Sequence, residues 1–384
     1  MLVISHACFT AVNRGVYRLF LNQGWNLELV VPETLRFPAG IKAAQAPAAG
    51  DPPLHYLPLR GENPRTYGFE GLISLLNRKK PRVILLDNDP VSRMAGVIGH
   101  WCRQNQAKLF CISCENLPLG IIDAIRKRGV GNLPAAIVKR WMLHRNKARI
   151  DGVFCINTDG RSIFRQEGFR GVHHMPLGFD PAIFFPDAPA GAEIRKRQGL
   201  TKKVIAYFGR LIPEKGIHIL IQALRQLKHL EWQFMMDRFD EYGTGYHGEI
   251  KRALDESGII DRVTFVHPNH IEIAAYMNAT DVIVVPSLTT PAWKEQYGRV
   301  AAEGMAVGKT VIASNSGALP ELVNGHGLLF EEGDAVALAG LLEQCLTGKA
   351  YGLPASGAIA LYARKKLSIY RQREVIEEAL GIVR

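Results

Sequence analysis

Short apolar runs alternate with amphipathic, helix-like segments along the chain. In its first part, apolar runs predict buried strands at Leu2–Ser5, Leu27–Val31, Arg82–Leu86, Lys108–Ser113, Gly152–Ile156 and Val172–Met175. The pattern returns further along, with strands expected at Val204–Phe208, Gln233–Met236, Val263–Val266, Val282–Val285 and Thr310–Ala313. Strands that are apolar throughout and separated by helices are typical of parallel sheets covered on both faces, so we predict an α/β protein.

The length of the chain predicts more than one domain. A chain of 384 residues is longer than a single hydrophobic core usually supports. Between the two series of strands, the segment 181–202 is rich in proline and charged residues, which is typical of a linker. We therefore expect a first domain over residues 1–180, a linker over 181–202 and a second domain from residue 203. A charged amphipathic helix is predicted at the end of the chain, over 363–384.

Composition narrows the class of protein. No apolar run approaches the roughly 20 residues that span a bilayer. The chain starts directly with a predicted strand and lacks a basic region followed by a long apolar stretch, so we expect a cytoplasmic protein. The cysteines are scattered, and Cys111 and Cys114 have no second pair at zinc-site spacing, which favours reduced thiols over a metal site. The formal net charge of +11 favours an anionic partner.

A dense basic segment lies at residues 126–149. Its basic residues are Arg126, Lys127, Arg128, Lys139, Arg140, Arg145, Lys147 and Arg149, and apolar residues stand between them. The segment could be an amphipathic helix on an anionic membrane, which would make the protein peripheral on the inner face of the cell membrane. It could equally be a solvated helix face whose apolar side belongs to the core. We expect no nucleic acid as its partner.

The stretch that says most about function is Ser287–Glu303, which leads from a predicted strand into an alanine-rich helix. Gly298 lets the backbone approach a ligand closely, and amides of the first helical turn, including that of Arg299, can donate to phosphate oxygens. Glu295 can accept hydrogen bonds from sugar hydroxyls, and Glu303 can hold a ribose diol with both oxygens. This layout suits a sugar attached to a phosphate.

Two carboxylates beside a diphosphate would repel it, so cations are expected from elsewhere in the chain. The loop Gly209–Gly216 meets this need, because it follows a predicted strand and carries Arg210 and Lys215. Arg210 offers a planar fork and Lys215 a mobile point charge, a suitable pair for a diphosphate leaving group.

The order of these motifs resembles the donor site of the retaining glycosyltransferases of family 4, which have the two-domain GT-B fold. The match consists of Glu295 and Glu303 with Tyr297 and Gly298 between them, preceded by Arg210-x4-Lys215-Gly. Shorter matches are Pro176–Asp180, Phe185–Pro186, Pro286–Ser287, Ala302–Ala306 and Ser316–Glu321. The resemblance implies two Rossmann-like parallel-sheet domains facing a deep interdomain cleft. The first (1–180) would bind the acceptor, the second (203–362) the nucleotide-sugar donor, and the last helix (363–384) would cross back to the first domain.

The resemblance also implies a reaction. Such proteins move a sugar from a nucleoside diphosphate, most often UDP, to an acceptor hydroxyl with retained anomeric configuration, and we expect a role in polysaccharide or lipid-linked glycan assembly. Arg210 and Lys215 would neutralise the departing diphosphate, and Glu295 would position the sugar. The remaining donor-binding residues would be Gly209, His270, Ile271, Tyr297, Gly298, Arg299 and Glu303. Because basic side chains take the phosphate role, neither a metal nor another cofactor is expected.

Polar side chains also follow the predicted strands of the first domain. Ligands of parallel sheets bind beyond the carboxyl ends of the strands, so His6, Asp89 and Asn116 are candidates for the acceptor side and Glu115 for catalysis. The family commonly has a His-Asp pair where this chain has Glu115-Asn116. It also usually has paired glycines in the first loop, where only Gly15 remains.

Two other interpretations stay open. The same fold occurs in UDP-sugar epimerases, which need acid and base carboxylates but no acceptor; a new epimer formed from a UDP-sugar alone would favour that reaction. The chain could also be a basic membrane-binding or nucleic-acid-binding protein with a decayed site. A dehydrogenase is disfavoured, because no Gly-x-Gly-x-x-Gly follows the first strand.

Overall fold

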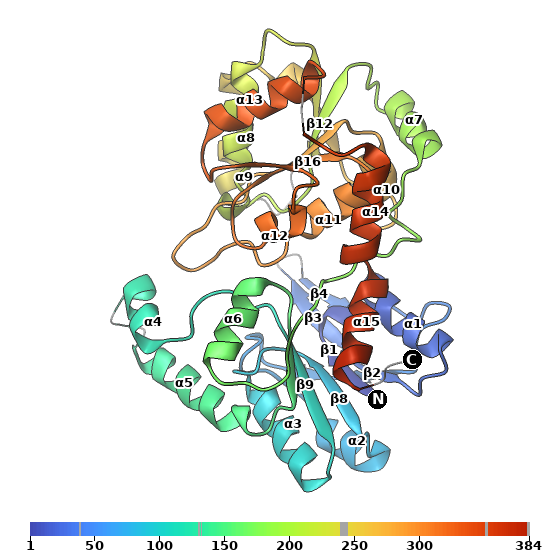
Figure 1. The fold of residues 1–384 in the computed structure, drawn as a ribbon, viewed down its shortest axis with the longest axis vertical. Helices are drawn as coiled ribbons and strands as arrows, with labels where there is room; N and C mark the ends of the chain where they lie inside the picture. The colour runs from blue at the N-terminus through green and yellow to red at the C-terminus, as the bar shows by residue number, and fades with distance from the viewer. Residues whose placement is uncertain (38–39, 130, 132, 239–244, 350–351, 382–384) are drawn as a thin grey trace. The chain divides into compact units, whose positions relative to one another are not determined.

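The computed structural model describes residues 1–37, 40–129, 131, 133–238, 245–349 and 352–381, except for the side chains of Ala124, Lys127 and Arg128. The chain divides into two compact units (Figure 1). The first unit runs over Met1–Gly178 and includes the end of the chain from Ile369, and the second runs over Phe179–Ser368. Each unit has its own parallel sheet and its own hydrophobic core.

The first unit is built on a seven-stranded parallel sheet in the order β11-β10-β9-β8-β1-β2-β5. Its strands are β1 (Leu2–Ser5), β2 (Glu28–Pro32), β5 (Leu54–Leu57), β8 (Val83–Asp87), β9 (Lys108–Ser113), β10 (Gly152–Cys155) and β11 (Val172–His174). The strands predicted here are confirmed to within one residue at each end. The prediction missed the edge strand β5 and two short hairpins, β3–β4 (Thr34–Phe37 and Gly40–Ala43) and β6–β7 (Leu59–Arg60 and Gly68–Phe69).

Helices pack around the sheet of the first unit. They are α1 (Gly15–Asn22), α2 (Leu72–Lys79), α3 (Arg93–Gln104), α4 (Ile121–Arg128), α5 (Leu133–Lys147), α6 (Thr158–Gln166) and α15 (Ile369–Ala379), and the 3-10 turns η1 (Ala7–Phe9) and η2 (Ala11–Arg14) precede α1. The side chain of Ser92 caps α3 by accepting from the Ala95 amide at 3.1 Å. Asn157 caps α6 by accepting from the Gly160 amide at 2.7 Å. Both caps start helices directly after loops that follow strand ends.

The second unit has a six-stranded parallel sheet in the order β14-β13-β12-β15-β16-β17. The strands are β12 (Lys203–Tyr207), β13 (Trp232–Asp237), β14 (Val263–Val266), β15 (Val282–Val285), β16 (Thr310–Ser314) and β17 (Leu328–Phe330), of which only β17 was not predicted. The helices are α7 (Ala188–Arg197), α8 (Ile217–Gln226), α9 (Gly245–Glu256), α10 (Ile273–Asn278), α11 (Arg299–Ala306), α12 (Leu319–Val323), α13 (Ala335–Leu346) and α14 (Ser356–Leu367), with the 3-10 turns η4 (Pro213–Lys215) and η5 (Ile260–Arg262). The strands β12 and β15 are parallel neighbours in the sheet, so their carboxyl ends lie side by side.

The prediction of a linker over 181–202 is wrong, because this segment is folded into the second unit. Pro189 and most of the segment's charged residues belong to α7, and Pro189 lies in its first turn, where the missing amide costs no hydrogen bond. Gly191 allows close packing on α10, since a Cβ there would lie 2.6 Å from the Asn278 carbonyl oxygen. The Arg195 guanidinium also pairs with Asp281 at 2.5 Å.

The end of the chain forms two helices where one was predicted. Ser368 has extended backbone and bridges Phe179, so it separates α14 from α15. Helix α14 packs against α11 in the second unit, and α15 packs against α1 in the first unit (Figure 1). Residues 382–384 of the predicted helix lie outside the described residues. Among the described helices, none combines the length and apolarity needed to cross a bilayer.

Candidate functional site

Two loops of the second unit interlock at the carboxyl edge of its sheet. One follows β12 and carries Gly209–Gly216, and the other follows β15 and leads to Gly298. The Leu288 amide donates to the Glu214 carbonyl at 2.8 Å. Gly216 has φ +67°, and a Cβ there would lie 1.8 Å from the Pro286 carbonyl oxygen, so only glycine fits this contact. The two loops that carry the predicted donor-site motifs therefore pack against each other, and we call them the donor loops.

An ion pair joins these loops. The Lys215 ammonium lies 2.6 Å from a Glu295 carboxylate oxygen, and the Ser287 hydroxyl donates to the same oxygen at 2.7 Å. The Lys215 ammonium also lies 5.1 Å from the centre of the Trp293 ring. Only 7% of the Glu295 side chain is exposed, so the pair is nearly desolvated on its acidic side. An ammonium has three N–H donors, and the bond to Glu295 leaves others that can reach a phosphate oxygen.

A third loop fixes the backbone of Glu295. The Ala318 amide donates to the Glu295 carbonyl at 3.0 Å. Gly317 has φ +51°, and a Cβ there would lie 2.0 Å from the same carbonyl oxygen. The Ser314 hydroxyl, at the end of β16, donates to the Ser287 carbonyl at 2.6 Å. The segment after β16, which the sequence offered only as a family signature, thus holds the sugar-binding candidate in place.

The start of α11 depends on Gly298. This residue has φ +88°, and a Cβ there would lie 2.4 Å from a methyl carbon of Leu319. Tyr297 beside it is buried, and its hydroxyl has no hydrogen-bond partner among the described residues. Glu303, one turn into α11, is also buried, and burial raises the pKa of its carboxyl to about 7, although the Arg299 charge opposes this shift. The helix therefore carries a carboxylate that titrates near neutrality.

The remaining donor-site candidates occupy the same edge of the sheet. Arg210 is exposed, and its carbonyl accepts from the Tyr207 hydroxyl at 2.8 Å. The Gly209 amide donates to Asp237 at 3.3 Å. His270 and Ile271 follow β14, which lies two strands from β12, and both are exposed. Tyr207 and Asp237 shape the Arg210 loop, and sequence reasoning missed both because no motif marks them.

In the first unit, the half-buried Asp89 and the buried Glu115 form one cluster. The Ser113 hydroxyl donates to the Asp89 carboxylate, and the Glu115 amide donates to the Ser113 hydroxyl at 3.1 Å. The Glu115 carboxylate pairs with Lys139 at 3.0 Å and with Arg65 at 3.3 Å. Burial, and then the Glu115 charge, raise the pKa of Asp89 to about 6. Sequence reasoning placed Lys139 in the basic segment and missed Arg65.

His6 lines a separate pocket with a volume of about 510 Å³. The Tyr67 hydroxyl lies 3.2 Å from His6 Nδ1. Arg36, from the β3–β4 hairpin, Arg60 and Glu62 also line this pocket. Arg36 pairs with Glu62 at 3.3 Å and Arg60 with Glu70 at 2.6 Å, so the pocket suits a polar group. The loop 63–67 connects it with the Glu115 cluster, because Arg65 pairs with Glu115 while Tyr67 contacts His6. Asn116, the last acceptor-side candidate, is buried.

Arg14 organises the first loop, where the sequence lacks paired glycines. Its side chain is fully buried and pairs with Asp51 at 2.9 Å. It also donates to the carbonyls of Cys8 and Gln45, at 2.8 and 2.7 Å. The loop therefore folds as η1 and η2 around a guanidinium, which supplies the hydrogen bonds that ordered loops need.

Comparison with known proteins shows what part of the second unit resembles. The model of the glycosyl transferases of group 1 matches residues 202–348, which include Lys215, Glu295 and Glu303. The prediction of two Rossmann-like parallel-sheet domains, the GT-B fold, is confirmed.

The matches to similar curated proteins each cover only part of this chain. The GDP-mannose-dependent alpha-(1-6)-phosphatidylinositol monomannoside mannosyltransferase of Mycobacterium tuberculosis is 31% identical over 208 residues, covering 50% of this chain and 52% of that protein. The D-inositol 3-phosphate glycosyltransferase of Stackebrandtia nassauensis is 34% identical over 185 residues, covering 45% of this chain and 40% of that protein. The chain thus spans about half the length of the curated relatives that it matches, or less.

Solved structures match over the whole chain. HepE of Anabaena, in complex with UDP and glucose, has a TM-score of 0.70 and 18% identity, covering 100% of this chain and 99% of that one. WaaG, a glycosyltransferase involved in lipopolysaccharide biosynthesis, has a TM-score of 0.69 and 12% identity, covering 99% and 100%. At such identities the likeness concerns the fold alone.

Proposed function

We propose that this protein is a retaining glycosyltransferase that moves a sugar from a nucleoside diphosphate to an acceptor hydroxyl. The observation that carries the proposal is the ion pair between Lys215 and Glu295, which joins the loops after β12 and β15. Glu295 also lies next to the start of α11, where its Cγ is 3.9 Å from the Cβ position of Gly298. A held ammonium, a carboxylate and a helix start in one place suit a sugar linked to a diphosphate.

Each group at this edge has a role in the proposal. Lys215 and Arg210 neutralise the charge that builds on the leaving diphosphate, and the backbone of Gly209, Gly298 and Arg299 allows its close approach. Glu295 positions the sugar while its own charge is balanced by Lys215. Further binding residues are Glu303 for the ribose, Tyr297 beside Gly298, and His270 and Ile271 for the base. The leaving phosphate oxygen takes the proton of the acceptor hydroxyl, which accounts for retention without a protein nucleophile.

The first unit would hold the acceptor. Glu115 is flanked by Lys139 and Arg65, so its charge is balanced and it can orient a hydroxyl of the acceptor. Asp89, with a pKa of about 6, exchanges protons near neutral pH. His6 and Asn116 would contact the distal part of the acceptor. A polar acceptor group suits the His6 pocket, where Arg36 pairs with Glu62.

UDP remains our first choice of nucleotide, and HepE, a structural neighbour, is seen with UDP and glucose. GDP-mannose is the second candidate, because the similar mycobacterial mannosyltransferases are named for it. The acceptor is expected to be a polysaccharide or a lipid-linked glycan. The D-inositol 3-phosphate glycosyltransferases among the relatives support a small polar acceptor as the alternative.

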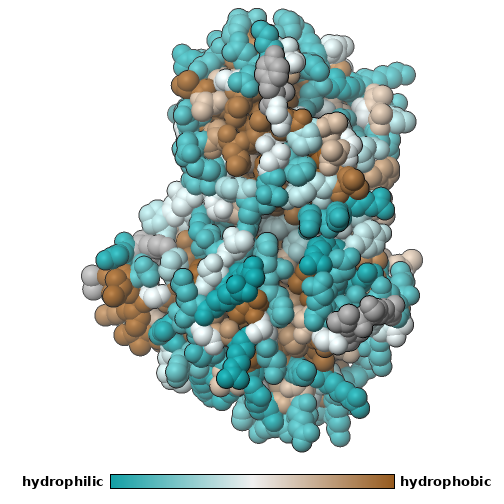
Figure 2. Space-filling view, viewed as in Figure 1, coloured by the Kyte–Doolittle hydropathy of each residue, from teal (hydrophilic) through white to brown (hydrophobic). Residues whose placement is uncertain are grey.

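A membrane surface is part of the proposal. Residues Ile122, Ile137, Val138 and Trp141 of α4 and α5 are 49 to 67% exposed, and Figure 2 shows hydrophobic atoms gathered over the region of α4. Several basic residues of the segment 126–149 have contacts within the first unit: Lys139 with Glu115, Arg140 with Glu167 and Lys147 with the Glu167 carbonyl. Residues 130 and 132 and the side chains of Lys127 and Arg128 lie outside the described residues. A peripheral contact with an anionic membrane is therefore supported by the exposed apolar residues more than by the number of basic residues in the segment.

Binding and turnover of donors test the proposal. Melting temperature is measured with UDP-glucose, UDP-N-acetylglucosamine and GDP-mannose, since a ligand that binds the native state raises it. Release of the free nucleotide and any epimer are then followed without acceptor. Transfer is supported if the wild type releases nucleotide and Lys215→Ala lowers this release about tenfold or more. The matched control is Lys251→Ala, at an exposed position of α9. A new epimer without release would favour the epimerase, and no shift with any donor would count against the site.

A further inference from the structure

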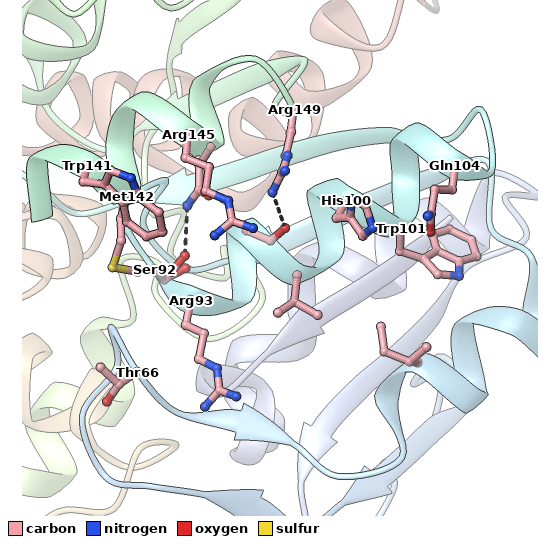
Figure 3. A pocket seen from close by; sticks show the side chains of 14 residues that line it. Thr66, Ser92, Arg93, His100, Trp101, Gln104, Trp141, Met142, Arg145 and Arg149 are labelled. Carbon is pink, nitrogen blue, oxygen red and sulfur yellow. Dashed lines mark hydrogen bonds between the residues drawn. The ribbon is translucent and has the colours of Figure 1, made fainter. Parts of the chain in front are cut away.

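A groove runs between α3 and α5 on the first unit (Figure 3). Its volume is about 630 Å³, within the roughly 300–1,000 Å³ of typical small-molecule sites. Asn146 of α5 donates to the carbonyls of Pro90 and Ser92, at 2.8 and 3.0 Å, and so fixes α5 against the start of α3. A buried polar contact therefore fixes the two walls of the groove to each other at the start of α3.

The lining of the groove is apolar along its length. Val97 and Trp101 come from α3, Trp141 and Met142 from α5, and Ile73 from α2. Trp141 is 57% exposed and Val97 is 43% exposed. Exposed apolar surface of this kind on two facing helices is unfavourable in water and marks a binding surface.

The groove is also strongly basic. Arg93 lines it from α3, Arg145 lines it from α5 and Arg149 lines it from the turn after α5, as Figure 3 shows, with His100 further along α3. Asp and Glu are absent from the residues that line it within the described part of the chain. The Arg145 guanidinium stacks at 5.1 Å from the centre of the Trp141 ring, and Arg149 donates to the Gly96 carbonyl at 3.3 Å. Like charges gathered without a carboxylate repel one another, so an anion would stabilise the arrangement.

We propose that this groove binds one anionic phospholipid molecule from a membrane, with its phosphate on the arginines and an acyl chain along Val97, Ile73 and Trp101. The apolar walls and the cations on both helices match the two parts of such a molecule. Trp141 joins the groove to the exposed apolar residues of α5, so a lipid could enter from a bilayer without crossing water. This site lies outside the donor loops, and it stands whether or not the chain transfers sugars.

Other anionic partners fit the groove less well. Single-stranded nucleic acid binds on several exposed aromatic faces, whereas of the two tryptophans in the lining Trp101 is 4% exposed and Trp141 alone presents its ring to the solvent. A peptide that binds as an added strand needs a sheet edge with free backbone groups, whereas both walls here are helices. Aliphatic side chains along the walls favour a hydrocarbon chain.

Calorimetric titration of the whole protein with soluble short-chain lipids tests the proposal. Dioctanoyl phosphatidylglycerol, kept below its micelle concentration, is expected to bind with a stoichiometry of one. Dioctanoyl phosphatidylcholine should bind at least about tenfold more weakly, and glycerol phosphate should not bind measurably. Equal binding of both lipids, binding of glycerol phosphate as tight as that of the lipid, or tighter binding of an acidic peptide or an oligonucleotide would overturn the proposal.

Variants locate the site. Arg145→Gln with Arg149→Gln should weaken binding of the anionic lipid about tenfold or more, whereas Arg225→Gln, an exposed arginine of α8, should leave it unchanged. Val97→Trp fills the groove but adds apolar surface. Occupation of the groove predicts that this variant loses the lipid, whereas adsorption on an open apolar face predicts equal or tighter binding. Since Val97 is exposed, the melting temperature should stay close to that of the wild type, which keeps a loss of lipid interpretable; unchanged binding by either groove variant would refute the site.

Discussion

Glu303 is a carboxyl group that the fold makes costly to ionise. Its pKa of about 7 lies above the usual 4.5 because of burial, so the folded state holds the proton more tightly than the unfolded chain does. The resulting stability is fully present below pH 4.5 and is lost as the pH rises through 7. Relative to Glu303→Gln, the free energy of unfolding of the wild type should therefore fall by up to about 3 kcal/mol between pH 4 and pH 8, as measured by urea denaturation.

The same carboxyl group links stability with donor binding. If the ionised form holds the ribose, donor affinity of the wild type should rise with pH through about 7. Glu303→Gln should bind the donor more weakly at pH 8 and show no such rise. If Glu303→Gln changes stability but keeps the rise of donor affinity with pH, Glu303 does not bind the ribose.

Lys215 and Glu295 should separate stability from activity. Lys215→Ala leaves the buried Glu295 carboxylate with the Ser287 hydroxyl but without the ammonium, so stability should fall by about 1–3 kcal/mol. Adding Glu295→Gln removes the carboxylate charge that lost its ammonium and should restore most of that loss, whereas nucleotide release should stay at least about tenfold below wild type. Denaturation and turnover are measured on the same samples. Recovery of turnover in the double variant would mean that the pair only supports the fold.

At the scale of elements, the contact between the two donor loops depends on one glycine. Gly216→Ala places a Cβ at φ +67° and 1.8 Å from the Pro286 carbonyl, so the loops must separate. The strain and the clash should together lower stability by about 2–5 kcal/mol, and donor binding should be lost even where the protein stays folded. Gly248→Ala, in α9 with nothing within 4 Å of its Cβ, should be neutral or slightly stabilising. Circular dichroism melts and donor titrations of both variants check this, and full donor binding by Gly216→Ala would contradict it.

The elements predicted best are those whose signal is local. Strands such as β9 and β15 are apolar at nearly every position because both faces of the sheet are covered, so their ends were predicted to within one residue. Strand β5 escaped because it lies at the edge of the sheet and all four of its residues are half-buried. The linker prediction failed at α7, because Pro189 starts a helix as readily as it interrupts one. Composition alone does not distinguish these two uses of proline.

The candidate site was predictable only where motifs are contiguous. Lys215 and Glu295 were found through their loops, but their pairing across 80 positions in the sequence is a tertiary contact. Glu115 was found at a strand end, whereas its partners Lys139 and Arg65 lie 24 and 50 positions away and follow no spacing rule. Side chains that balance a buried charge from another element leave no local signal in the sequence.

For the molecule as a whole, the charge on the donor loops should replace a metal ion. Arg210 and Lys215 together supply the positive charge that a divalent cation supplies in other sugar and phosphoryl transferases. Chelation with EDTA is therefore expected to leave nucleotide release unchanged. A loss of activity in EDTA that magnesium or manganese restores would show that the two side chains do not suffice.

The course of the chain also links the two units, since α15 returns to the first unit after α14 has packed in the second. Ile376 of α15 is 1% exposed, so Ile376→Asp would place a charge in the core of the first unit and should destabilise that unit by about 3 kcal/mol or more. The donor loops belong to the second unit, and donor should still raise the melting temperature of that part. Tyr370→Asp, on an exposed position of the same helix, is the control. Differential scanning calorimetry with and without donor would resolve the unfolding transitions of the two units. If Ile376→Asp loses both the transition of the first unit and the rise in melting temperature caused by the donor, α15 supports the donor site as well.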